Sequence, residues 1–296
     1  MSSPPVPSQP FEKIINFRDV GSYINSTTNQ QLLKPGLLLR SARPDAATPR
    51  DRETLLNIYH LKTVIDLRTE TEHLEATKKF TTQQPPSAPT VKPADPKRPL
   101  RIPGITYKDV DFNGKPYSSA LLKQLSWRHT GKLYGLYVAG YRKQAISVLG
   151  TNVMAQRGLA GLAEDSLAHC TKEVKAVFDV LADAASYPVL VHCTQGKDRT
   201  GLTVLLVLML CGVPQEAIER DYRLSERELE VERTEKVEEI RSIGLPDSFA
   251  DCPPDWVRLV SGFVDEQYGG VEKYLDSCGV GREMQSRVRE VMMVEP

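Results

Sequence analysis

The sequence predicts an α/β fold: a central, mostly parallel sheet flanked by helices, with a helical C-terminal region. Short apolar runs alternate with helical patterns over the first two thirds of the chain, which is typical of parallel strands joined by helices. The last third, by contrast, contains helical patterns alone. With 296 residues, of which 40% are hydrophobic and 26% charged, the chain has the composition of an ordinary globular protein.

Four short runs are expected to form the strands. Apolar residues crowd in most of them, as in strands that are buried on both faces of a sheet. The runs are GLLLR at 36–40, TVIDL at 63–67, ITYKDV at 105–110 and PVLVH at 188–192.

Helices are expected between and after these strands. A Thr-Pro pair starts one at 48–59, and apolar residues near helical spacing predict another at 163–185. We interpret residues 214–296 as a helical cover on the same domain. Glycine and proline divide it into helices at 214–224, 225–243, 254–268, 271–277 and 281–293.

Two segments are expected to lack regular structure. Residues 1–10, MSSPPVPSQP, have neither the charged nor the apolar part of a signal peptide and are expected to be a disordered tail. Residues 81–103 hold seven prolines and few large apolar side chains, which predicts an exposed loop. We place no domain boundary in that loop, because the chain is short for two full-sized domains. We therefore expect a single domain over 11–296.

Charge, cysteine content and hydropathy argue against several classes of protein. Lys+Arg and Asp+Glu both number 38, and this balance does not favour a nucleic acid as partner. The five cysteines show no paired spacing, which argues against a disulfide framework and a zinc site and favours a reduced, cytoplasmic compartment. The most apolar run, LTVLLVLMLC at 202–211, is too short to span a bilayer and is expected to form a buried helix.

The chemistry is concentrated in the stretch VLVHCTQGKDRTG at 189–201, which predicts a strand, a tight loop and a helix start. Ligands of α/β sheets bind at the carboxyl ends of strands, and a helix N-terminus offers free N–H groups and the positive end of its dipole. The backbone N–H groups of 194–199 are expected to form an anion-binding ring around Cys193. Such a ring favours the thiolate, the form of cysteine that attacks phosphorus.

Four further residues of this stretch have expected roles. Arg199, six residues after Cys193, can hold two phosphate oxygens with its planar fork and stabilise the charge of the transition state. Gly196 allows the backbone to turn sharply, and Thr200 can donate its hydroxyl to the thiolate. His192 is expected to orient the loop by bonding to the backbone, not to act as a base.

The segment HCTQGKDRTG resembles the signature of the protein tyrosine phosphatase superfamily, and more narrowly that of the tyrosine/serine phosphatase family of bacteria and fungi. The similarity continues in NFRDVG at 16–21, LLRSA at 38–42, VIDLRTETE at 64–72, EAIERDYRLS at 216–225 and YGGVEKYLDSCG at 268–279. Residues 127–162 and the proline-rich segment match nothing in that family.

This resemblance implies a phosphatase α/β fold and hydrolysis of phosphate monoesters through a phosphocysteine intermediate, with no metal and no cofactor. Arg43, in a block similar to the family, is expected to support the pocket. The residues expected to bind the phosphate are Thr194, Gln195, Gly196, Lys197 and Thr200.

Lys197 bears on the substrate. A lysine in the loop adds positive charge beside the phosphate, and the Lys-Asp-Arg form resembles loops of phosphatases that accept phosphoinositides as well as phosphoproteins. Alternatively, Lys197 offsets Asp198 or faces solvent. The expected partner is therefore a phosphorylated protein, in a dual-specificity reaction, or a phosphoinositide.

Three carboxylates are candidates for the general acid that protonates the leaving group. Asp198 belongs to the phosphate loop and so lies beside the nucleophile. Asp109 and Asp111 follow a predicted strand, where their spacing of two would put them on one face. Their position resembles the mobile acid loop of the superfamily, although its Trp-Pro-Asp form is absent.

Two other functions compete with a phosphatase. Sulfur transfer of the rhodanese type also uses a cysteine in an anion-binding loop, but the spacing to Arg199 and the Thr-Gly that follows favour the phosphatase. A phosphate-sensing pseudophosphatase is the non-enzymatic alternative. The presence of Cys193, Arg199 and several candidate acids argues against it.

Overall fold

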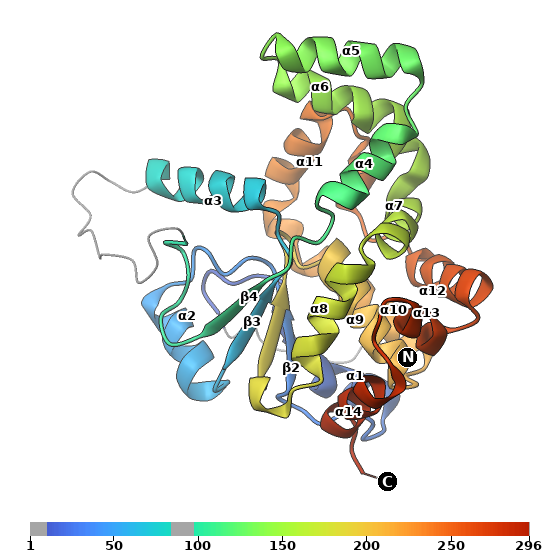
Figure 1. The fold of residues 1–296 in the computed structure, drawn as a ribbon. Helices are drawn as coiled ribbons and strands as arrows, with labels where there is room; N and C mark the ends of the chain where they lie inside the picture. The colour runs from blue at the N-terminus through green and yellow to red at the C-terminus, as the bar shows by residue number, and fades with distance from the viewer. Residues whose placement is uncertain (1–10, 84–97, 296) are drawn as a thin grey trace.

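A sheet lies at the centre of the protein (Figure 1). Its strand order is β1-β2-β5-β3-β4. The computed structural model describes residues 11–83 and 98–295. β1 runs antiparallel to β2, and the other neighbouring strands are parallel. The strands are β1 Arg18–Asp19, β2 Leu38–Ser41, β3 Thr63–Asp66, β4 Thr106–Asp109 and β5 Val189–His192. The α/β class and the four predicted strands are confirmed, whereas β1 is too short to give a pattern in the sequence.

Both faces of the central strands are buried, because their side chains alternate between two cores. Leu39, Val64 and Leu190 lie in register across β2, β3 and β5 and face the smaller core. Their apolar neighbours in the strands, Leu38, Ile65, Val189 and Val191, face a larger core, which they share with α9 (Asp198–Leu210). This arrangement explains why the strands are continuous apolar runs in the sequence.

The remaining helices join the strands or cover the sheet. They are α1 Val20–Thr28, α2 Pro49–Glu53, α3 Glu70–Gln83, α4 Lys115–Lys123, α5 Trp127–Val138, α6 Arg142–Leu149, α7 Ala155–His169, α8 Thr171–Leu181, α10 Gln215–Glu228, α11 Arg233–Ser242, α12 Trp256–Tyr268, α13 Val271–Ser277 and α14 Arg282–Met292. π-Helical turns at Thr54–Ile58 and Gly150–Met154 follow α2 and α6, and 3-10 turns lie at Ala184–Ser186, Glu230–Glu232 and Asp247–Ala250.

Two predicted helices are divided in the structure. The helix expected at 163–185 is two helices, α7 and α8, separated at Cys170, whose backbone angles of φ −110° and ψ 36° are not helical. Both helices bury apolar side chains in the same core, so the spacing of apolar residues in the sequence continues across the break at Cys170. The helix expected at 225–243 is the end of α10, a 3-10 turn and then α11.

The predicted proline-rich loop at 81–103 is shorter than expected at its start. Residues 81–83 form the last turn of α3, and residues 98–101 form turns and bends. The rest of that prediction, at 84–97, and the predicted tail at 1–10 lie outside the described residues.

The C-terminal helices share the larger core with the sheet. α10 packs on α1 and α9, α13 on α9, and α14 on α8 (Figure 1). Leu206 in the middle of α9 is buried, and Tyr222, Trp256 and Val288 from the later helices belong to the same cluster. Within residues 11–83 and 98–295, no helix has the length and apolarity needed to cross a bilayer.

Candidate active site

The predicted loop lies at the carboxyl edge of the sheet. Ser41, Asp66 and His192 end β2, β3 and β5 in one register, so the segments after these strands meet at a single edge. Cys193 follows β5 directly, and α9 begins at Asp198. No side chain caps the first turn of α9 within the described residues, which leaves its N–H groups free to bind an anion.

The conformation of the loop requires its glycine. Gly196 has a φ of +67°, and a Cβ there would lie 2.0 Å from the carbonyl oxygen of Ser41. Three neighbours then hold the carbonyl groups of the loop. Asn16 Nδ2 donates to the Gln195 oxygen over 2.9 Å, Arg40 Nη2 to Gly196 over 2.7 Å, and the Arg43 amide to Thr194 over 3.1 Å.

A buried charge network supports the loop from behind. Arg18 Nε lies 2.6 Å from Asp221 Oδ1, and Arg40 Nη1 pairs with the other oxygen of the same carboxylate. All three side chains are at most 2% exposed. Burial opposes ionisation of Asp221, but the two guanidinium groups outweigh it and lower its pKa. Arg40 therefore reaches the carbonyl of Gly196 from a fixed position.

Removing the charge of Asp221 should destabilise the protein strongly. Asp221→Asn leaves two buried guanidinium groups without a counter-charge, and we expect a loss of at least about 3 kcal/mol in the free energy of unfolding, measured by urea denaturation. Asp247→Asn is the matched control, because Asp247 pairs with Arg241 on the surface and should matter little. Equal effects of the two substitutions would contradict the role given to Asp221.

Arg199 is held by Glu72, a residue that the sequence did not single out. Arg199 Nη1 and Nη2 each lie 2.6 Å from one oxygen of Glu72, and Nη1 also donates to the Leu67 carbonyl over 3.1 Å. Thr194 Oγ1 donates to the same carboxylate. Burial disfavours the Glu72 carboxylate, but the bonds from Arg199 and Thr194 hold its pKa at about 2.

This pairing leaves one edge of the Arg199 guanidinium available. A guanidinium has five N–H donors. Nη1 uses both of its N–H groups, one for Glu72 and one for the Leu67 carbonyl, and Nη2 uses one N–H group for Glu72. Among the described residues, no partner takes the Nε–H or the second Nη2–H, and together these form a fork that matches two phosphate oxygens.

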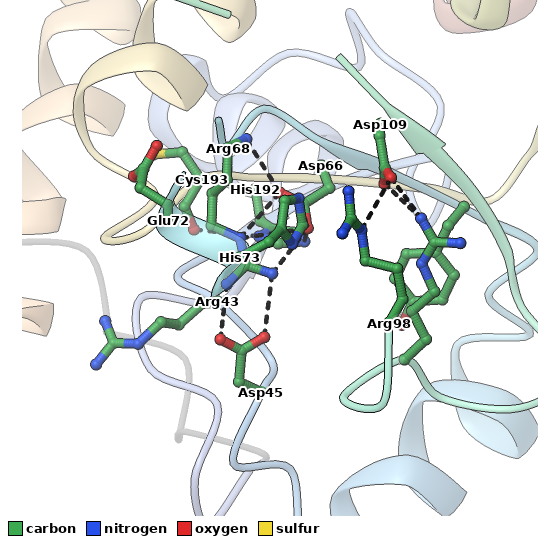
Figure 2. A network of polar contacts seen from close by, with 12 residues as sticks. Arg43, Asp45, Asp66, Arg68, Glu72, His73, Arg98, Asp109, His192 and Cys193 are labelled. Atoms are coloured by element: carbon green, nitrogen blue, oxygen red, sulfur yellow. Dashed lines mark hydrogen bonds and ion pairs between the residues drawn. The ribbon is translucent and has the colours of Figure 1, made fainter. Parts of the chain in front are cut away.

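His192 connects the nucleophile to a second network (Figure 2). Its Nδ1 donates to the carbonyl of Cys193 over 3.1 Å, and its Nε2 lies 3.3 Å from Asp66 Oδ2. Asp66 also accepts from Arg68 Nη2 over 2.8 Å, and Arg68 pairs with Asp45. His192 thus contacts the backbone of the residue that follows it.

One group of side chains has the composition of a metal site, but its charges do not fit a cation. Single ligand atoms of Asp66, His73 and Asp109 lie within 4.8 Å of one another. However, Arg101 Nη2 lies 2.6 Å from the Asp109 carboxylate, and Arg68 donates to the Asp66 carboxylate. These guanidinium groups already neutralise the carboxylates and would repel a metal ion.

A cavity of about 550 Å³ opens above the loop. Cys193, Thr194, Gln195, Asp198 and Arg199 line it. Apolar side chains form much of its wall, namely Tyr117, Met154, Leu159, Leu162, Ala163, Leu202, Ile240, Ile243, Leu245, Phe249 and Trp256. Charged residues of α3 and α11 and of the turn before α11 also line it, among them Glu75, Lys79, Glu232, Glu235, Lys236 and Glu239. Arg43 lines the cavity too and pairs with Glu232 at 3.0 Å.

Lys197 does not lie where the sequence analysis placed it. Its side chain is completely buried, and its Nζ donates to the carbonyls of Phe249 and Asp251 over 2.8 Å each. It is not among the residues that line the cavity. The expectation of a lysine charge beside the phosphate is therefore wrong, because carbonyl groups of the C-terminal region bind the Lys197 ammonium. Lys197 Nζ also lies 3.6 Å from Asp198 Oδ1, as in the alternative in which it offsets Asp198.

Of the three candidate acids, the structure brings only Asp198 into the cavity lining. Asp109 is the last residue of β4, and Arg98 and Arg101 hold its carboxylate. Asp111 lies beyond the end of the strand and is exposed, so strand spacing does not put it on one face with Asp109. Thr200 lies in the first turn of α9 and does not line the cavity, and its Oγ1 is buried and without a partner within the described residues.

The sequence analysis did not identify Glu72, Arg40 and Asp221 as site residues, because no sequence pattern assigns them to the site. Thr69 and Glu72 have the spacing of a capping box, and they do bond reciprocally at the start of α3, so the pattern alone indicates a helix cap. Arg40 and Asp221 are 181 positions apart, and no local pattern connects them.

The model of the tyrosine phosphatase family matches residues 9–294, and the chain belongs to this family.

Two curated proteins are similar over part of the chain. A tyrosine-protein phosphatase of Nostoc commune is 33% identical over 157 residues, which cover 47% of this chain and 53% of that protein. The triple specificity protein phosphatase PtpB of Mycobacterium tuberculosis is 30% identical over 125 residues, which cover 37% of this chain and 45% of PtpB. The chain thus matches about half the length of these relatives.

Proposed function

We propose that the protein hydrolyses phosphate monoesters, with Cys193 as the nucleophile. The observation that supports this best is the shared position of Cys193 and Arg199 in the cavity, at the uncapped N-terminus of α9. The phosphate would bind the free N–H groups and the open edge of Arg199. The Cys193 thiolate then attacks phosphorus, the P–O bond to the leaving group breaks, and a phosphocysteine forms. Water hydrolyses this intermediate and releases phosphate and the thiolate.

The apolar wall supports an aryl phosphate as the preferred substrate. Tyr117, Phe249 and Trp256 line the cavity near the loop residues, so a phosphotyrosine ring would be surrounded by apolar atoms. Dual specificity towards phosphoserine and phosphothreonine is part of the proposal, as the name of PtpB suggests for that relative. Lys197 gives no argument for phosphoinositides as substrates, because its charge is directed away from the cavity.

A panel of substrates tests the proposal. We expect the purified protein to release phosphate from phosphotyrosine peptides faster than from phosphoserine peptides and phosphoinositides, to retain activity in excess EDTA, and to be inhibited competitively by vanadate. Sulfur transfer from thiosulfate without phosphate release would show a rhodanese-type enzyme. Phosphopeptide binding without release would show a pseudophosphatase.

Asp198 is proposed as the general acid, since it lies in the cavity with Cys193. Alkoxide leaving groups need a proton far more than phenolates do, so Asp198→Asn should reduce turnover of phosphoserine at least about tenfold more than that of an aryl phosphate. The basic limb of the pH profile should flatten in the same variant. Asp109→Asn and Asp111→Asn are the matched controls. A selective loss in either of them, and not in Asp198→Asn, would show a mobile acid loop instead.

A further inference from the structure

The helical hairpin of α5 and α6, residues 127–149, has no role in the proposed reaction. α5 packs against α6, and no residue of α5 is fully buried. The hairpin stands at the end of the molecule far from α14 (Figure 1). None of its residues lines the cavity. It belongs to residues 127–162, which match none of the sequence blocks that resemble the phosphatase family.

The hairpin exposes an unusual amount of apolar surface. Of the ten large apolar side chains that are exposed in the described part of the chain, six lie in or between these two helices. Trp127 is 80% exposed and Val138 86%. The other four are Tyr134, Tyr137, Tyr141 and Ile146. Apolar side chains gathered on one element in this way indicate an interaction site.

The charge of the same region is uniformly positive. Residues 112–163 contain seven Lys and Arg and no Asp or Glu, although the whole chain has 38 residues of each sign. Arg128, Lys132, Arg142 and Lys143 of the hairpin are exposed, and none of them forms an ion pair with another described residue. Arg128 lies 5.3 Å from the ring centre of Trp127, and Arg142 lies 5.8 Å from that of Tyr137.

Aromatic and basic side chains are ordered around α5. At roughly 100° per residue, Trp127, Tyr134 and Val138 fall in one narrow stripe of the helix. Arg128 and Lys132 follow along one flank of that stripe. The partly buried Leu133 and Leu136 are on the opposite side, where α5 packs on the protein. The stripe and its basic flank therefore face outward together.

We propose that the α5–α6 hairpin docks on an anionic lipid surface. Trp and Tyr prefer the headgroup level of a bilayer, and Lys and Arg beside them are attracted to anionic lipids. A second copy of the chain fits less well, because a two-fold contact through this face brings four cationic side chains opposite four others with no acidic residue between them. An acidic protein would match the charges but would also need an apolar patch that fits Trp127 and Val138, whereas an anionic bilayer supplies both the charge and the apolar layer.

Vesicle binding of the full chain tests this docking surface. We expect co-sedimentation with phosphatidylcholine vesicles that contain phosphatidylserine, little with phosphatidylcholine alone, and weaker binding at high salt. Arg128→Glu/Lys132→Glu and, separately, Trp127→Ala/Tyr134→Ala should each weaken binding at least about tenfold. Lys273→Glu/Arg282→Glu, the same charge change on exposed residues of α13 and α14, should stay within about twofold.

Turnover of a small soluble aryl phosphate should be unchanged in all three variants, which shows that the fold and the cavity are intact. Equal binding to neutral and anionic vesicles, no binding to either, or equal loss in the α13–α14 control would overturn the proposal. A dimer in solution that Trp127→Ala/Tyr134→Ala dissociates would overturn it as well, in favour of self-association. None of these outcomes depends on which phosphate ester the cavity hydrolyses.

Discussion

Replacing Cys193 by serine should abolish phosphate release and leave the fold intact. A serine hydroxyl is not ionised near neutral pH, so the phosphoenzyme cannot form, and we expect turnover to fall by at least about a thousandfold. Cys193 is 2% exposed, and oxygen for sulfur is a small change in volume, so the thermal midpoint should barely move. The measurement is phosphate release at saturating substrate, together with substrate binding by calorimetry, which the variant should retain.

Cys211→Ser is the matched control for this substitution. Cys211 follows the last residue of α9, is 6% exposed, and burial raises its pKa to about 12, so it remains a neutral thiol. Its replacement should leave the catalytic rate within about twofold, because a neutral buried thiol has no part in the reaction. If Cys193→Ser kept a substantial part of the activity, Cys193 would not be the nucleophile.

Arg199→Lys should lower the catalytic rate by about 100-fold or more. Lysine keeps the positive charge, but it cannot hold Glu72 through two nitrogens and at the same time present a second pair of donors to the phosphate. The loss should appear mainly in kcat, since charge on the equatorial oxygens is stabilised most in the transition state. Steady-state kinetics with an aryl phosphate measure it.

Arg101→Lys gives the comparison for Arg199. Arg101 lies outside the cavity and binds the Asp109 carboxylate at the surface, so its replacement should leave kcat nearly unchanged. An Arg199→Lys variant within a few-fold of the unmodified protein would show that Arg199 does not hold the phosphate.

The sequence predicts those parts of the protein whose information is local. β2, β3, β4 and β5 appear as short runs bounded by turn residues, and the loop at 193–199 combines several residue types at fixed spacing. The break at Cys170 is not predictable in this way, because α7 and α8 bury their apolar sides in one core and share one periodic pattern.

The direction of a loop side chain depends on distant partners. Lys197 and Arg199 are both basic and only two positions apart, yet one binds carbonyls at 249 and 251 and the other lies at the cavity. Likewise, Glu72 has the spacing of a helix cap, and only the folded protein shows that its carboxylate also holds Arg199.

The bonds of Lys197 determine how far the chain can be shortened. A fragment that ends before Phe249 would leave the buried ammonium of Lys197 with neither of its two carbonyl acceptors. A fragment that ends at Cys211 would also lack Asp221, the counter-charge of Arg18 and Arg40. The region after α9 is therefore not a detachable regulatory module. Any truncation, domain swap or chimera must carry the phosphate loop and residues 212–251 together.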